Sequence, residues 1–111
     1  MNKVDEKWFK AQGWEVANYD ESDTNDEDIR KRRGWTNIKK VVCRKEVNGS
    51  IARYEHVVEN MWWQDGTLRS RSNYYIFYAW GVNGFKVEHR CSSRKFTDEQ
   101  ILSALKVVGI E

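Results

Sequence analysis

The chain has 111 residues, which is the size of one ordinary domain, so residues 1–111 are expected to form a single domain. Hydrophobic residues are 40% of the chain and charged residues 32%, a composition that excludes global disorder. No apolar run approaches the roughly 20 residues that cross a bilayer. The first ten residues also lack the apolar stretch of a secretory signal. We therefore expect an intracellular, cytoplasmic protein.

Charge is distributed unevenly along the chain, although its net value is only +2. Residues 1–29 carry three basic and nine acidic groups, residues 30–96 carry fifteen and five, and residues 97–111 carry one and three. A basic middle segment is thus flanked by acidic ones. This asymmetry points to charged partners.

A short helix is predicted over residues 4–12. Val4, Trp8 and Phe9 share one apolar helical face, and Gly13 is suited to the helix end. Residues 14–19 then alternate apolar and polar side chains, which predicts a short strand.

An acidic segment follows at residues 20–28 and is predicted to be a flexible, solvated loop. Thr24 and Glu27 form a capping-box pattern, which predicts a short polar helix whose last turn is the basic run 30–33. Next to Trp35, the same basic run also fits a phosphate-binding segment.

Two Asn-Gly pairs, at residues 48–49 and 83–84, predict two-residue hairpins, because type I′ turns need positive φ at both central residues. The first hairpin would pair residues 38–47 with 50–58. The second would pair residues 69–82 with 85–91.

A C-terminal helix is predicted from the capping box of Thr97 and Gln100, ahead of an apolar stripe that ends at Gly109. The predicted fold class is therefore α+β. It combines an antiparallel β-sheet of at least four strands, built from the two Asn-Gly hairpins, with N-terminal and C-terminal helices packed on one face.

The turn positions assign every strand residue to a face of the sheet. In the second hairpin, a two-residue turn sets Trp80 opposite Val87. The predicted core face then comprises Val41, Cys43, Ala52, Tyr54, Val58, Tyr74, Ile76, Tyr78, Trp80, Val87 and Cys91, with His56 and His89 among them.

The solvent-facing side of this sheet is predicted to be basic and aromatic. Its members are Lys40, Arg44, Arg53, Arg69, Arg71, Tyr75, Phe77, Lys86 and Arg90, with Glu46, Glu55 and Glu88 as partial counter-charges. Lys and Arg neutralise phosphates and flat rings stack on bases, which favours a non-enzymatic module that binds single-stranded or structured RNA or DNA. The same residues are also typical of ordinary cross-strand pairs on the solvent side of a sheet.

Trp62 and Trp63 lie in the link between the two hairpins. Adjacent residues of an extended segment point to opposite sides, so one of the two rings can be exposed as an anchor for a partner. An alternative function is therefore a small protein-binding accessory or inhibitor, of the kind that phages and other mobile elements encode, acting through exposed Trp and the charged loop.

Cys43, His56, His89 and Cys91 are zinc-ligand types on the predicted core face, but their spacing matches no zinc motif. Buried His and Cys of a core explain them better, so no metal site is expected. The sequence also lacks G-x-S-x-G, P-loop and H-E-x-x-H motifs. We expect no catalytic site, no cofactor and no small-molecule ligand; the expected partner is nucleic acid or protein, away from membranes.

Overall fold

The computed structural model of the protein describes residues 3–92 and 95–110. Its elements, in chain order, are α1 (Glu6–Ala11), β1 (Glu15–Ser22), α2 (Glu27–Arg33), β2 (Trp35–Val47), β3 (Ser50–Trp62), β4 (Leu68–Trp80), β5 (Lys86–Cys91) and α3 (Asp98–Val107). The predicted α+β class is confirmed. Within the described ranges, no helix is both long and apolar enough to span a membrane.

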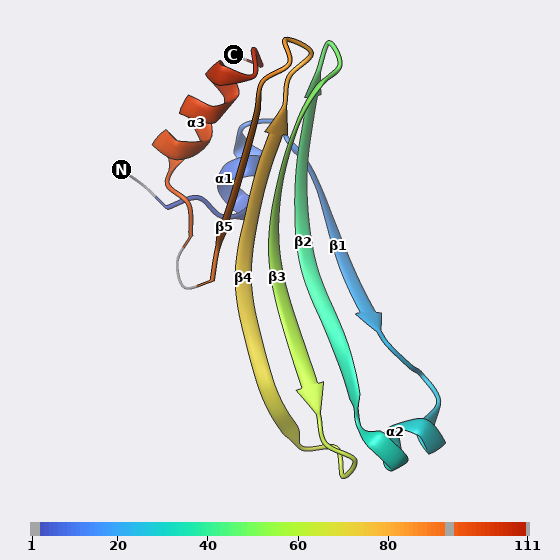
Figure 1. The fold of residues 1–111 in the computed structure, drawn as a ribbon. Helices are drawn as coiled ribbons and strands as arrows, with labels where there is room; N and C mark the ends of the chain where they lie inside the picture. Colours follow the sequence, from blue (N-terminus) through green and yellow to red (C-terminus); the bar gives the residue numbers. More distant parts are fainter. Residues whose placement is uncertain (1–2, 93–94, 111) are drawn as a thin grey trace.

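The five strands form one antiparallel sheet in which each strand lies beside its neighbours in sequence (Figure 1). Cys43, Tyr54 and Phe77 are successive partners across β2, β3 and β4. Directly opposed residues project from the same side of a sheet. We call the side that carries these three residues the core face and the opposite side the outer face.

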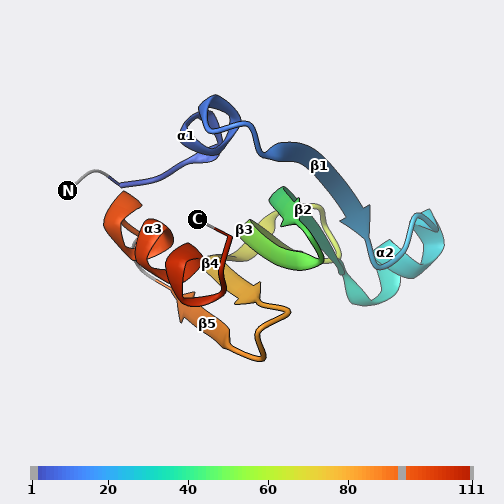
Figure 2. The same ribbon diagram turned by 90° about the horizontal axis from the view of Figure 1, so that it is seen from above.

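Helices α1 and α3 supply side chains to the buried core. Phe9 of α1 stacks on Tyr54 with ring centroids 4.5 Å apart, while Ile101 and Leu105 of α3 belong to the same buried cluster. Figure 1 shows both helices beside the upper part of the strands and α2 at the lower end, and Figure 2, which looks down the strands, shows α1 and α3 away from α2. The core is therefore concentrated at one end of the strands, which we call the proximal half.

The strands are much longer than the helices that supply the core. Thirteen residues of strand span about 43 Å, whereas the ten residues of α3 span about 15 Å. The molecule measures 50 × 28 × 23 Å, and its radius of gyration is 17.0 Å. A compact domain of this length has a radius of about 13 Å. The distal half, residues 35–39, 58–62 and 68–73, therefore extends beyond the core.

The register of β4 against β5 corrects one prediction. A two-residue turn at Asn83-Gly84 would set Trp80 opposite Val87, but the observed partner of Val87 is Ala79. The N–H of Gly84 donates to the carbonyl of Gly81, and Gly84 has φ +90°. This geometry is a three-residue loop with glycine in the left-handed region, which shifts the pairing by one residue.

The one-residue shift exchanges the two sides of β4, because side chains alternate along a strand. Tyr75, Phe77 and Ala79 are buried on the core face. The sequence had predicted that residues 74, 76, 78 and 80 would lie there instead. The residues that move to the outer face are Tyr74, Ile76, Tyr78 and Trp80. At Asn48-Gly49, by contrast, both residues have positive φ and the flanking residues 47 and 50 are directly opposed.

The acidic segment is also more ordered than predicted. Asp20 and Ser22 belong to β1, where they pair with Lys39 and Asn37 of β2, and α2 begins at residue 27. The loop is thus confined to residues 23–26. Asp26, and not Thr24, caps α2, because its carboxylate accepts from the N–H groups of residues 28 and 29. The predicted C-terminal capping box, formed by residues 97 and 100, is confirmed.

The corrected register predicts opposite stability effects for two adjacent residues of β4. Phe77→Ala removes a ring that is 1% exposed, so we expect a loss of about 3–5 kcal/mol in the free energy of unfolding. Tyr78→Ala removes a part-exposed ring on the outer face and should cost about 1 kcal/mol. Urea unfolding measures both; a larger loss for Tyr78→Ala would contradict the register.

Candidate functional site

The outer face carries five of the cations that the sequence assigned to it. They are Lys40, Arg44, Arg53, Lys86 and Arg90, and the same face carries Glu15, Glu21, Glu46, Glu55, Glu59 and Glu88. Five cations against six carboxylates leave this face nearly neutral. The pairs are direct: Arg44 lies 2.8 Å from Glu46, and Lys40 lies 3.7 Å from Glu55.

The other predicted site residues lie elsewhere. Tyr75 and Phe77 are buried in the core, and Arg71 lies on the core face in the distal half. Arg69 lies at the irregularity between β3 and β4, with its guanidinium 4.7 Å from the ring centre of Trp63. The structure therefore does not gather the predicted residues into one surface.

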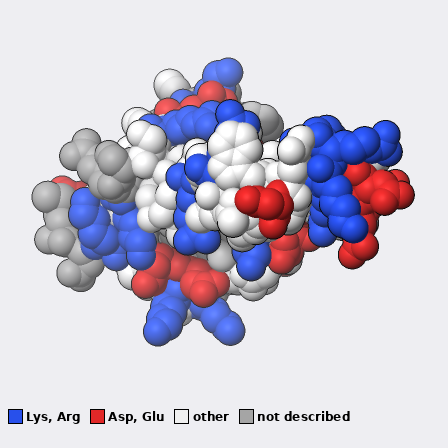
Figure 3. Space-filling view, turned by 90° about the horizontal axis from the view of Figure 1, so that it is seen from below, with Lys and Arg blue, Asp and Glu red and all other residues white. Residues whose placement is uncertain are grey.

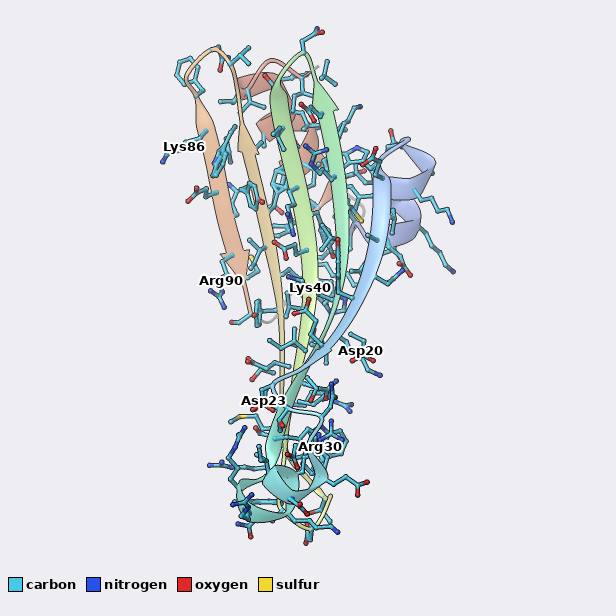
Figure 4. The ribbon with its side chains drawn as sticks, turned by 90° about the vertical axis from the view of Figure 1, so that its right-hand side faces the viewer. Asp20, Asp23, Arg30, Lys40, Lys86 and Arg90 are labelled. Carbon is cyan, nitrogen blue, oxygen red and sulfur yellow. The ribbon has the colours of Figure 1, made fainter. Side chains whose placement is uncertain are left out.

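A hollow of about 530 Å³ opens on the core face of the distal half. We call it the distal hollow. It is lined by Asp20, Ser22, Asn25, Arg30, Trp35, Asn37, Lys39, Asn60, Trp62 and Arg71. These residues come from β1, the loop and helix α2, β2, β3 and β4, so five segments of the chain meet here. Figure 4 shows Arg30 and Asp23 at this narrow end of the molecule, far from Lys86 and Arg90 along β5.

Two stacked indole rings form the aromatic part of the hollow. Trp35 and Trp62 are cross-strand partners whose ring centroids are 5.8 Å apart at an interplanar angle of 16°. The Nε1–H of Trp62 donates to Asn37 at 2.9 Å, and the guanidinium of Arg30 lies 4.9 Å from the ring centre of Trp35. Stacking, a hydrogen bond and a cation–π contact therefore hold both rings in place.

Two of the three cations of the hollow are positioned by polar partners. Arg30 donates from Nε to the carbonyl of Thr24 at 3.0 Å, and Arg71 donates from Nε to Asn60 at 2.7 Å. Asn60 is only 4% exposed, so this bond satisfies a buried amide oxygen. The bond from Nε of Arg71 fixes its guanidinium and leaves the Nη groups as donors for a ligand, whereas Nη2 of Arg30 also donates to Ser22 at 3.2 Å and to Asn25 at 3.3 Å.

The hollow has an excess of positive charge. Arg30, Lys39 and Arg71 face one carboxylate, Asp20, which gives three positive charges against one negative charge. Lys39 and Asp20 are 3.9 Å apart and both mostly exposed, so their attraction is weak. The distal hollow is therefore cationic, in contrast to the outer face.

Asp23 attaches α2 to the sheet beside the hollow. Its carboxylate accepts from the Thr36 N–H at 3.1 Å and from Arg33 at 3.2 Å. Burial raises the pKa of Asp23, but the hydrogen bonds from Thr36 and Arg33 outweigh it, and the net pKa is lowered. Because the pKa of Asp23 is lower in the folded than in the unfolded protein, the ionised carboxylate stabilises the fold at pH values above its ordinary pKa. This stabilisation is lost as the pH falls through the pKa of the folded state.

Exposed rings and cations continue from the hollow to the tip of the molecule. Trp63 is 51% exposed and lies under the guanidinium of Arg69. Figure 3 views the molecule from this end and shows several groups of Lys and Arg side chains, some with carboxylates beside them. Of the two adjacent Trp residues, Trp62 thus belongs to the hollow and Trp63 to the tip.

The four weak metal candidates are not brought together. Cys43 lies on β2, His56 on β3, and His89 and Cys91 on β5. Neighbouring strands are about 4.8 Å apart, so β2 and β5 are separated by about 14 Å. His56 instead contacts the Asn73 amide. In the described part of the chain, no group of three or more His, Cys, Asp or Glu residues could hold a metal ion.

Comparison with protein-family models, with curated proteins and with solved structures yields no match. The function of the distal hollow is therefore inferred from its own residues. The sequence named Arg71 for the outer face and Trp62 as an anchor for a protein partner, and it did not name Lys39, Asn37 and Asn60 as parts of one site. In the sequence, the signal for a site in this region was the basic run 30–33 next to Trp35.

Gly34 connects α2 to β2 and lies against the backbone of Trp62, where an added Cβ would overlap the carbonyl oxygen. Gly34→Ala combines this clash with a φ of +74°, so we expect a loss on the order of 3 kcal/mol in unfolding free energy. Gly13 is the matched control, because it has φ +84° and open space around its Cβ position. Gly13→Ala should cost about 1–2 kcal/mol. Urea unfolding measures both variants; equal losses of unfolding free energy would contradict the close approach of Gly34 to the backbone of Trp62.

The two thiols should differ in reactivity. Cys43 is fully buried, and burial, with Glu6 and Asp5 nearby, raises the pKa of its thiol to about 11. At pH 8 it therefore remains protonated and shielded, whereas Cys91 is only partly buried. Titration of the native protein with a disulfide reagent should modify one thiol quickly, and addition of denaturant should expose the second. Fast modification of both thiols in the native protein would contradict this placement.

Proposed function

We propose that this protein is a non-enzymatic module that binds single-stranded nucleic acid in the distal hollow. The observation that carries the proposal is the combination of three cations, one carboxylate and a fixed pair of stacked Trp rings in one hollow. Phosphate groups require cations, and unpaired bases require flat rings and amide groups. Such groups are concentrated here and not on the nearly neutral outer face.

Each component of a nucleotide has a complement in the hollow. Arg30, Lys39 and Arg71 neutralise phosphates. Part-exposed Trp62 in the hollow offers a ring to a base, half-exposed Trp63 adds a second ring at the adjoining tip, and base stacking contributes roughly 1–3 kcal/mol per base. Asn37 has more hydrogen-bonding positions than its recorded partners occupy, so it is able to contact a base edge.

The size of the hollow favours a single strand over a duplex. A volume of about 530 Å³ lies in the range of pockets that enclose a small ligand. It accommodates roughly one or two nucleotides at a time. Sequence-tolerant recognition of unstacked bases is the mode that such a site supports.

A second candidate function, capture of a protein partner, has an observation of its own. Met61, Trp63 and Leu68 are large apolar side chains exposed together around the β3–β4 connection. Exposed aromatic anchors of this kind are typical of protein interfaces. Salt separates the two functions, because phosphate contacts weaken steeply with ionic strength and an apolar interface weakens less.

The decisive test compares two adjacent lysines of β2. Lys39 lines the distal hollow, whereas Lys40 lies on the outer face beside Glu55. We expect Lys39→Gln to weaken binding of a single-stranded oligonucleotide by about 3- to 10-fold at low salt, and to lower the salt slope by about 0.7. Lys40→Gln should leave both quantities unchanged. Tryptophan fluorescence titration at several salt concentrations measures them.

The outcomes separate the alternatives. Equal losses for the two variants would indicate attraction by the overall charge and contradict binding in the hollow, whereas a loss for Lys40→Gln alone would place binding on the outer face. Wild-type protein that fails to bind single strands even at low salt would eliminate the nucleic-acid function. Capture of a protein partner around Trp63 would then be the remaining candidate function.

A further inference from the structure

Strand β5 ends the sheet, so one of its edges is turned away from β4. Its alternate residues Lys86, Glu88 and Arg90 point to the outer face and are all exposed. Figure 4 shows Lys86 and Arg90 spaced along this edge of the molecule. An open edge with a regular charge pattern offers a template for another strand.

The hydrogen bonds of the β4–β5 hairpin show which backbone groups face this edge. The N–H of Gly81 donates to the carbonyl of Phe85 at 2.8 Å, so the carbonyl of residue 85 points toward β4. Backbone groups alternate in direction along an antiparallel strand. Residues 87 and 89 therefore also bond toward β4, and the N–H and C=O groups of Lys86, Glu88 and Arg90 point outward.

An apolar strip lies beside the same edge on the core face. Phe85 is 62% exposed and Val107 of α3 is 47% exposed. Between β5 and α3 runs an open hollow of about 450 Å³, whose apolar lining residues are Val87, Ala104 and Val107 and whose polar ones are His89, Thr97, Glu99, Gln100 and Ser103. A strand added to β5 would cover this strip with every second side chain.

We propose that the occupant of this edge is β5 of a second copy of the same chain, paired antiparallel with Val87 opposite Val87. Lys86 of each copy then lies opposite Glu88 of the other, and this ion pair occurs twice. The outward-pointing backbone groups of residues 86 and 88 meet as hydrogen-bonded pairs. Phe85 and Val87 of both copies lie together on the core face, beside the two α3 helices.

The charge sequence restricts the possible registers. Moving the pairing by two residues in one direction sets Glu88 opposite Glu88 and Lys86 opposite Arg90; moving it in the other direction sets Lys86 opposite Lys86. Like charges directly opposed across a ladder are unfavourable. A shift by a single residue would place outward-pointing backbone groups of one copy opposite inward-pointing groups of the other, so they would not form hydrogen bonds.

The charges also match when His89 lies opposite His89, where Glu88 faces Arg90 twice. The register with Val87 opposite Val87 is favoured over it because it brings Phe85 and Val87 of both copies together, and because the guanidinium of Arg90 already lies over the Tyr74 ring of its own copy. The edge is thus complementary to itself, which is the property a two-fold interface requires.

The dimer joins two five-stranded sheets at their β5 edges and leaves both distal hollows free at opposite ends. The proposal is therefore independent of nucleic-acid binding. It also accounts for the exposure of Phe85 and Val107, which in an isolated copy would be an aggregation hazard beside an open edge.

Charge reversal tests the ion pairs on the full-length protein. We expect the wild type to dimerise reversibly in sedimentation equilibrium, and Lys86→Glu or Glu88→Lys alone to raise the dimer dissociation constant by about tenfold or more. The double variant exchanges the two charges and should restore the constant to within about threefold of wild type. A monomeric wild type at all concentrations, or a double variant no better than the single ones, would overturn the proposal.

Cysteine substitution tests the register independently of the affinity. In a Cys91→Ser background, Val87→Cys places the introduced thiol opposite its own copy, so mild oxidation should yield a covalent dimer. Glu88→Cys is the matched control, because residue 88 lies opposite residue 86, and after the same oxidation it should run as a monomer on a non-reducing denaturing gel. Cross-linking through Glu88→Cys and not through Val87→Cys would overturn the proposed register.

Discussion

The mismatch between strand length and helix length governs this structure. β2, β3 and β4 each contain thirteen residues, whereas α1 contains six and α3 ten, so the helices reach only the proximal half of the sheet. Burial of Phe9, Tyr54 and Phe77 concentrates the hydrophobic stabilisation there. The distal half has to be held by other interactions.

Those interactions are aromatic and polar, and they create the distal hollow. Trp35 stacks on Trp62, Arg30 lies over Trp35, and Arg71 satisfies the buried amide of Asn60. A site whose groups are fixed by such contacts loses little conformational entropy when a ligand binds. The contacts that hold the distal half together thus also orient the groups that face a ligand.

Different surfaces of the molecule are suited to different partners. The distal hollow is cationic, the outer face pairs charges of β2 and β3 internally, and the β5 edge combines outward-pointing backbone groups with alternating charges. The distal hollow and the β5 edge do not overlap, because β5 spans only the proximal half of β4. Binding in the hollow and pairing of the edge are therefore compatible in one particle.

By itself, the sequence determined the features that depend on local interactions. The capping box of Thr97 and Gln100 specifies α3, and alternating apolar residues between turn residues specify an antiparallel sheet. The register of β4 and β5 was decided by tertiary structure, because Asn83-Gly84 permits both a two-residue turn and the three-residue loop that starts after Gly81. One residue of difference buries Phe77 and exposes Tyr78. The distal hollow was likewise beyond local prediction, since five separate segments form it and no spacing along the chain records their proximity.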